Sequence, residues 1–165
     1  MRGTRRVRGG LALIGLLGLI GCGGSKPAPA GAGTPAAATP PAGSGLTAFE
    51  MENGVGPITS VVTVGPLDHK LAEQGEKLFE AKCTACHKLT ERYVGPSLGG
   101  VTVRRTPTYV MNMILAPDQM YAKHPVAKEL LGEYMTQMPN LSLTTDQARA
   151  LMEYLREHDA GGEKH

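Results

Sequence analysis

Aromatic residues are scarce in this sequence, where they make up 4% of 165 residues, with no Trp and two Phe. A large aromatic core and a platform of rings for stacking nucleic-acid bases are therefore poorly supported. Charged residues account for only 19%, against 41% hydrophobic residues. This length and composition suit one domain of about 100 to 150 residues and do not suffice for two full domains.

A strong excess of positive charge is also missing. The formal net charge is +2, but residues 1–21 hold four arginines and no acidic residue. Without that segment the chain has 13 basic and 15 acidic side chains, a net charge of −2. An acidic domain lacks the basic surface that phosphate backbones require, so we expect no nucleic-acid partner.

The sequence has no apolar run long enough to span a bilayer. Its longest, residues 11–21, follows the arginine-rich opening. A basic segment followed by about 7 to 15 apolar residues is typical of a cleaved secretory signal, here residues 1–21. The end of the run, Leu19-Ile-Gly-Cys22, resembles a bacterial lipobox.

The lipobox resemblance implies that Cys22 is lipidated and becomes the new N-terminus. An ordinary signal peptide with a nearby cysteine is the alternative. Twin-arginine export through Arg5-Arg6 is disfavoured, because the residues that follow this pair are not apolar. We therefore expect an exported protein that is lipid-anchored to the membrane and faces the periplasm or extracytoplasmic space.

A linker and an arm follow the cysteine. Residues 23–45 include six Gly, five Pro and seven Ala, a composition that cannot form a core. We expect 22–45 to be a flexible tether with a reach of about 25 to 70 Å. Residues 46–67 are richer in Val, Ile and Thr and are interrupted by two Gly-Pro pairs, which predicts an extended accessory arm rather than a helix.

The remaining chain, residues 68–160, has the pattern of an all-α domain, before a disordered tail at 161–165. Apolar residues at three- and four-residue spacing predict helices over 69–81, 107–115 and 125–135. Asp68 and Thr106 are expected to cap the first two. A capping-box pattern from Thr144 to Gln147 opens a last helix that ends near residue 158.

The chemistry is concentrated in Cys83-Thr-Ala-Cys86-His87, directly after the first helix of this domain. This C-x-x-C-H pattern is typical of c-type haem attachment. The two thiols can add to the two vinyl groups along one edge of a porphyrin, and the histidine can then reach the iron. We expect one haem c per chain, covalently attached through Cys83 and Cys86, with His87 as an iron ligand.

Three other interpretations compete for the same residues. A redox dithiol favours a thioredoxin-like βαβ context, which an all-helical chain does not provide. A structural zinc site needs four ligands, and the only other cysteine is Cys22 in the lipobox. A disulfide over two intervening residues is geometrically awkward and leaves His87 unexplained.

A closed haem site needs a sixth ligand, and Met138 is the best candidate because Pro139 turns the chain out of a helix there. Met135, one turn earlier, is expected to pack against the domain. His124 could give bis-histidine ligation, but beside a lysine it is expected to be a solvated surface residue. Four further methionines, Met111, Met113, Met120 and Met152, are expected to fill the core or lie at the surface.

These residues together resemble the class I monohaem c-type cytochromes over about residues 68–158. The resemblance rests on Gly75 and Phe79, the C-x-x-C-H motif, Gly95-Pro-Ser-Leu98, Met138-Pro-Asn and the closing helix with Leu151 and Tyr154-Leu155. It implies that Gly75 and Phe79 cross the last helix, and that the Pro96 carbonyl accepts a hydrogen bond from His87. It also implies haem-binding roles for Pro96 and Leu98, and for Met138 as the second iron ligand.

The resemblance implies an electron carrier rather than an enzyme, because His/Met ligation closes both axial positions. A haem enzyme or gas sensor with a labile sixth ligand is the alternative. The arm is similar to tethered bacterial cytochromes that feed respiratory reductases such as nitrous oxide reductase. We expect a monomer that exchanges electrons with a membrane-bound donor and a terminal oxidase or reductase. Haem propionates could be held by Arg104, Arg105, Tyr109 or Asn112, which could equally be solvated or packing residues.

Overall fold

A computed structural model describes residues 45–161, which form seven helices and no strand within that range. The helices are α1 (Ala48–Asn53), α2 (His69–Lys82), α3 (Val101–Arg104), α4 (Pro107–Leu115), α5 (Pro117–Lys123), α6 (Pro125–Tyr134) and α7 (Thr145–Gly161). The all-α fold is as predicted. The expected signal peptide, Cys22, nearly all of the tether, and residues 162–165 of the tail lie outside the described residues.

The four predicted helices correspond to α2, α4, α6 and α7, and their starts follow the expected capping chemistry. The Asp68 side chain accepts a hydrogen bond from the Leu71 backbone, and Thr106 caps α4 in the same way. At the start of α7 the Thr144 and Gln147 side chains each accept the other's backbone N–H. Each cap satisfies a donor that the first helical turn leaves without a partner.

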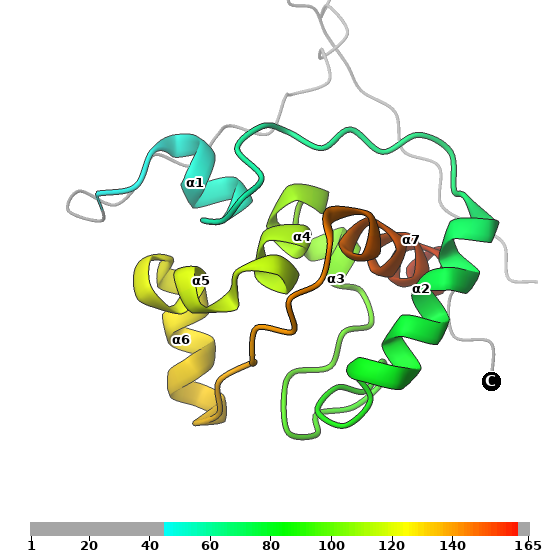
Figure 1. The fold of residues 1–165 in the computed structure, drawn as a ribbon. Coiled ribbons are helices and arrows are strands. Elements are labelled where there is room, and N and C mark those ends of the chain that lie inside the picture. The colour runs from blue at the N-terminus through cyan, green and yellow to red at the C-terminus, as the bar shows by residue number, and fades with distance from the viewer. Residues whose placement is uncertain (1–44, 162–165) are drawn as a thin grey trace, which may run out of the picture. The chain divides into compact units, whose positions relative to one another are not determined.

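Helices α2 and α7 pack against each other (Figure 1). They cross at Gly75, as the resemblance implies. A Cβ at this position would lie only 2.1 Å from the carbonyl oxygen of Ala150 in α7. One turn later, the Phe79 and Tyr154 rings pack with their centroids 5.2 Å apart. The absence of a side chain at residue 75 is therefore what allows the two backbones to touch.

Methionines take the place of aromatic rings in the core. Met111 and Met152 join Phe79, Leu151 and Leu155 in the main buried cluster, which lies between α2, α4 and α7. Met120 belongs to a second cluster with Val55, Tyr109 and Ala127. The flexible thioether side chain fits irregular spaces between short helices.

The arm differs from its prediction, because residues 48–53 form helix α1. Thr47 and Glu50 make a complete capping box at its start, and this local chemistry outweighs the turn-rich composition around it. The rest of the arm is irregular and runs along one edge of the molecule from α1 to α2 (Figure 1).

An amide and a hydroxyl side chain of α4 attach the arm to this helix. The Asn112 amide donates to the carbonyls of Asn53 and Ile58, and its oxygen accepts the N–H of Ile58 at 3.0 Å. Thr108 accepts the Val62 N–H at 2.8 Å. These bonds satisfy polar groups that would otherwise be buried without partners.

His124 is buried, and the prediction of a solvated surface residue is wrong. It is 1% exposed, and its Nε2–H donates to the Met51 carbonyl at 3.1 Å. Its ring meets the edge of Tyr109. Burial lowers the pKa of His124 below its ordinary value, the hydrogen bond to Met51 opposes this shift, and the Arg105 charge adds to it. The arm therefore covers this histidine.

Among residues 45–161, none of the helices combines the length and the apolar character that crossing a bilayer requires.

Candidate haem-binding site

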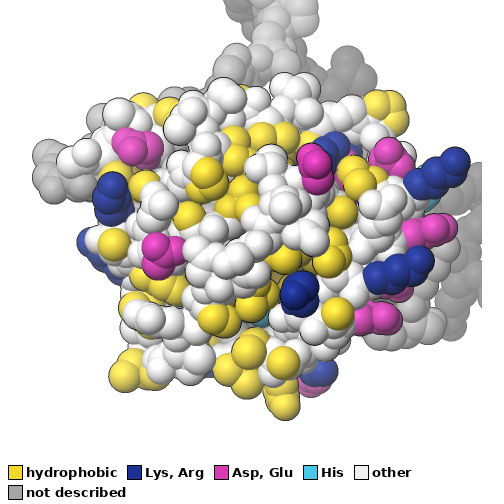
Figure 2. Space-filling model, viewed as in Figure 1, with side chains coloured by type: hydrophobic (Ala, Val, Ile, Leu, Met, Phe, Trp, Pro, Cys, Tyr) yellow, Lys and Arg dark blue, Asp and Glu magenta, His cyan; other side chains and the backbone are white. Residues whose placement is uncertain are grey.

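An apolar cavity of about 270 Å³ opens between the helices of the domain. Side chains from all six helices α2 to α7 line it, together with the loop that follows Cys83 and the segment after α6. In the view of Figure 2, hydrophobic side chains gather over the middle and lower part of the molecule, and charged side chains lie mostly around them. The cavity suits a large apolar group.

Cys83 and Cys86 lie at the end of α2. Cys83 is the C-cap of this helix, and its carbonyl accepts the N–H groups of Cys86 and His87 at 3.0 and 2.8 Å. This tight turn places all three residues in the lining of one cavity, and both cysteines are free thiols. Burial raises the pKa of the Cys83 thiol above its ordinary value.

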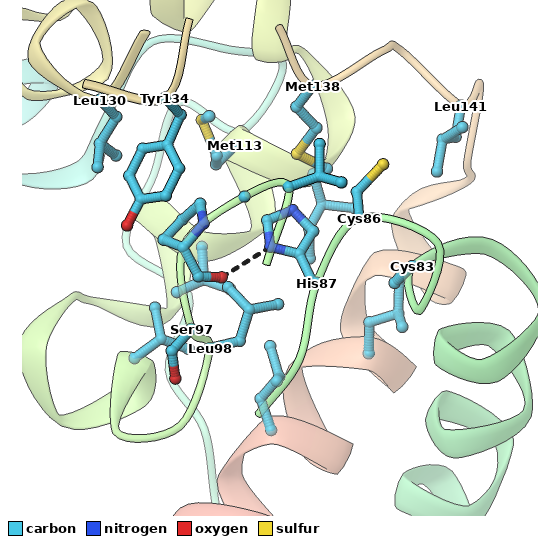
Figure 3. A pocket seen from close by; sticks show the side chains of 18 of the residues that line it. Cys83, Cys86, His87, Ser97, Leu98, Met113, Leu130, Tyr134, Met138 and Leu141 are labelled. Carbon is cyan, nitrogen blue, oxygen red and sulfur yellow. Dashed lines mark hydrogen bonds between the residues drawn. The ribbon is translucent and has the colours of Figure 1, made fainter. Parts of the chain in front are cut away.

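The His87 ring is held from behind by the following loop. Its Nδ1–H donates to the Pro96 carbonyl at 2.9 Å, the hydrogen bond that the resemblance implies (Figure 3). This bond fixes the orientation of the ring and leaves Nε2 available to a metal. A Cβ on Gly95 would lie 2.6 Å from Cε1 of His87, so glycine is required beside the imidazole.

Met138 lines the cavity and points from its loop toward the side on which His87 lies (Figure 3). Met135, by contrast, is 83% exposed, has a left-handed backbone at φ 52°, and is not among the lining residues. The expectation that Met135 packs against the domain is therefore wrong. A second methionine, Met113 on α4, does line the cavity, although its helical spacing had predicted packing in the core or a place at the surface.

The polar groups of the lining fit a haem with its propionates. The hydroxyl of Tyr109 is buried and has no hydrogen-bond partner among the described residues. Arg104 and Arg105 line the same cavity and would supply positive charge. Asn112 does not take part, because its amide is used by the arm.

Two further residues take part in the site without a predicted role of their own, and a third, Arg92, lies outside the cavity lining but connects two segments next to it. Gly95 contacts His87, as described above, and Tyr121 lines the cavity and accepts the Met138 N–H at 2.9 Å. Arg92 pairs with Glu133 at 2.8 Å and stacks over the Tyr134 ring, joining the loop after His87 to the end of α6. These are contacts between distant segments, and only the Gly-Pro turn had a local signal.

The zinc interpretation finds no support in the structure. In the part of the chain from 45 to 161, no three His, Cys, Asp or Glu side chains come together in a group that could hold a metal ion. The cavity lining instead brings together the two thiols and the oriented histidine of the C-x-x-C-H motif, with Leu98 and Met138. This combination defines a c-type haem protein.

Comparison with known proteins leads to the same class. The family model for cytochrome c matches residues 72–159, and the chain belongs to the cytochrome c family. A cytochrome c from Rhodothermus marinus is 46% identical, and the similarity covers 68% of this chain and 97% of that chain with a TM-score of 0.64. An engineered form of that cytochrome, 45% identical, covers 67% and 96% with a TM-score of 0.63.

A cytochrome c-553-like protein of Synechocystis sp. is 35% identical over 46 residues, which are 27% of this chain. The matched part spans 44% of the length of that relative. Family membership means that this protein carries covalently bound haem c with its iron, acts as a haem-based electron carrier and exchanges electrons with redox protein partners. The residues around the cavity fit this cofactor.

Proposed function

We propose that this protein is a membrane-tethered carrier of single electrons, with His87 and Met138 as the two axial ligands of its haem. The observation that carries the ligand assignment is that both side chains line one apolar cavity while the Nδ1–H of His87 is committed to Pro96. Bound haem c supplies an iron that cycles between two oxidation states. Cys83 and Cys86 would hold it covalently.

The protein's own residues would keep the electron-transfer site unreactive. The Pro96 carbonyl orients the imidazole, and Leu98 and the other apolar residues of the lining exclude water. Met138 as the second iron ligand would leave no position open for a substrate, and a thioether would raise the reduction potential relative to a second histidine. These properties support a carrier over a haem enzyme or gas sensor.

The tether determines where the carrier would work. Lipidation at Cys22 would anchor the exported chain to a membrane, facing the periplasm or extracytoplasmic space, and residues 23–45 would let the domain move about 25 to 70 Å. A donor and an acceptor in the same membrane then meet the domain at a high effective concentration. We propose a membrane-bound donor and a terminal oxidase or reductase, with nitrous oxide reductase as one candidate acceptor.

Two variants test the tether. Cys22→Ser should release a folded, haem-loaded protein from membranes. Deletion of half of residues 23–45 should leave the visible spectrum and the potential unchanged while slowing electron delivery to a membrane-bound acceptor. Membrane attachment of Cys22→Ser would contradict lipid anchoring, and an unchanged delivery rate in the shortened protein would contradict the role of the tether.

Carbon monoxide distinguishes a carrier from an enzyme or sensor. The reduced protein should bind the gas slowly, because Met138 must first leave the iron, and it should not turn over peroxide. Rapid binding or peroxide turnover would reveal an open iron site and overturn the proposed carrier function.

A further inference from the structure

Helix α5 lies between the N-terminal arm and the segment that bears Met138. Two consecutive residues of this helix face these two segments, one residue toward each. Successive helical residues point about 100° apart. Met120 faces the arm, and Tyr121 lines the haem cavity. A short helix thus connects a segment remote from the haem to the residue proposed as an axial ligand.

The contact between Met120 and the arm is tight. Met120 is fully buried, and its Sδ accepts the N–H of Val55 at 3.1 Å. A Cβ on Gly54, whose φ is +76°, would lie 2.7 Å from that sulfur. The arm therefore fits against α5 without spare volume, and α5 has little freedom to shift.

The segment after α6 depends on α5 for its position. Residues 135–144 are irregular, so the regular hydrogen bonds of a helix do not fix them. The Tyr121 hydroxyl accepts the N–H of Met138 at 2.9 Å, and Asp118 accepts the side-chain amide of Asn140 at 3.3 Å. Asp118 and Tyr121 are three residues apart and share one face of α5. Two of its side chains therefore hold the Met138 segment on both sides of Pro139.

We propose that Tyr121 is a positioning residue for Met138, and that the arm acts on the haem site by holding the helix that carries Tyr121. The inference rests on the proposed His87/Met138 ligation and assigns a purpose to the arm. Tyr121 holds the backbone of the ligand residue at the place from which its thioether reaches the iron. When this hydrogen bond is lost, the segment is released and an external ligand competes more easily for the iron.

The test is an imidazole titration of the oxidised, haem-loaded full chain, followed by loss of the sulfur-to-iron charge-transfer band. Tyr121→Phe removes only the accepting hydroxyl and retains the ring in the cavity. A neutral hydrogen bond corresponds to about a two- to twelvefold change in an equilibrium constant. We expect imidazole to bind more tightly to this variant by about that factor, with the charge-transfer band intact before imidazole is added.

Tyr154→Phe is the matched control. Tyr154 is also half-buried, but it lies on α7 against Phe79 and outside the cavity lining. The control should have the imidazole affinity of the wild type. An unchanged affinity in Tyr121→Phe, or an equal change in Tyr154→Phe, would overturn the positioning role.

Met120→Leu tests the connection to the arm, because it keeps a similar volume and removes the sulfur acceptor of Val55. Imidazole affinity should again rise while helical circular dichroism is retained; an unchanged affinity would overturn the role of the arm. A wild-type protein without the charge-transfer band would overturn the His87/Met138 ligation itself. A normal band with unaltered affinity in Tyr121→Phe would overturn only the inference about Tyr121.

Discussion

Replacing Gly75 by Ala should destabilise the folded protein by about 2 kcal/mol, although alanine is the better helix former. A Cβ at residue 75 would lie 2.1 Å from the carbonyl oxygen of Ala150, 2.6 Å from its carbonyl carbon and 2.8 Å from the Cβ of Tyr154. Two of these atoms are backbone and cannot rotate away, so α2 and α7 must separate. Overpacking costs about 1 to 3 kcal/mol, and contacts this close to backbone atoms call for the upper end, about 3 kcal/mol. The gain in helix propensity offsets about 1 kcal/mol, which leaves about 2 kcal/mol.

Gly132→Ala is the matched control for this prediction. Gly132 also lies inside a helix, α6, but a Cβ there would meet no atom within 4 Å. The substitution then changes only the helix propensity, which favours alanine, so this variant should be more stable than the wild type by up to about 1 kcal/mol. The same chemical change is thus expected to have opposite signs at two positions.

Urea unfolding of the haem-loaded protein, followed by circular dichroism at helical wavelengths, measures both effects. With a slope of about 2 kcal/mol per molar urea, Gly75→Ala should lower the midpoint by about 1 M. Gly132→Ala should raise it. A Gly75→Ala midpoint equal to or above that of the wild type would show that the two helices can separate without cost, and would refute the reasoning.

Two further predictions concern the ligand and the buried histidine. Met138→Ala should abolish the sulfur-to-iron charge-transfer band, and Met135→Ala should leave it intact because that side chain is exposed; the absorption spectra of the two variants decide between them. The folded pKa of His124 is lowered by burial, partly opposed by its bond to Met51, so the unfolded chain takes up the proton first. Stability from this residue is therefore present above about pH 6.5 and lost as pH falls from there toward the folded pKa. Urea titrations at several pH values should show a flatter profile for His124→Gln than for the wild type, and an equally steep profile would contradict this role of His124.

The sequence predicted helices well where a cap and an apolar stripe coincide. Thr106 followed by Pro107 marks the start of α4, and the predicted and observed ranges agree. Helix α1 was missed because a capping box at Thr47 is its main signal and two Gly-Pro pairs follow it in the same arm. Helix α5 was missed because its first residue, Pro117, stands just after the predicted 107–115 helix, where a proline suggests a helix end, whereas a proline also suits a first helical position.

The site was predictable as far as its residues are neighbours in sequence. Cys83, Cys86 and His87 form one motif, and the Pro96 carbonyl follows at a family spacing. The contact of Tyr121 with Met138 spans 17 residues and two helices, so no local pattern announces it. His124 was misplaced for a similar reason, because the segment that buries it is the arm, 73 residues earlier at Met51.

The order in which the chain leaves the ribosome bears on the arm. Its hydrogen-bond partners include Thr108, Asn112 and His124, which follow it by 46 to 73 residues. The arm is thus made early and can dock only after α4 and α5 exist, so its contacts close long loops and form late. Residues 83–87 are made before those partners. Docking of the arm onto α4 and α5 therefore completes the fold.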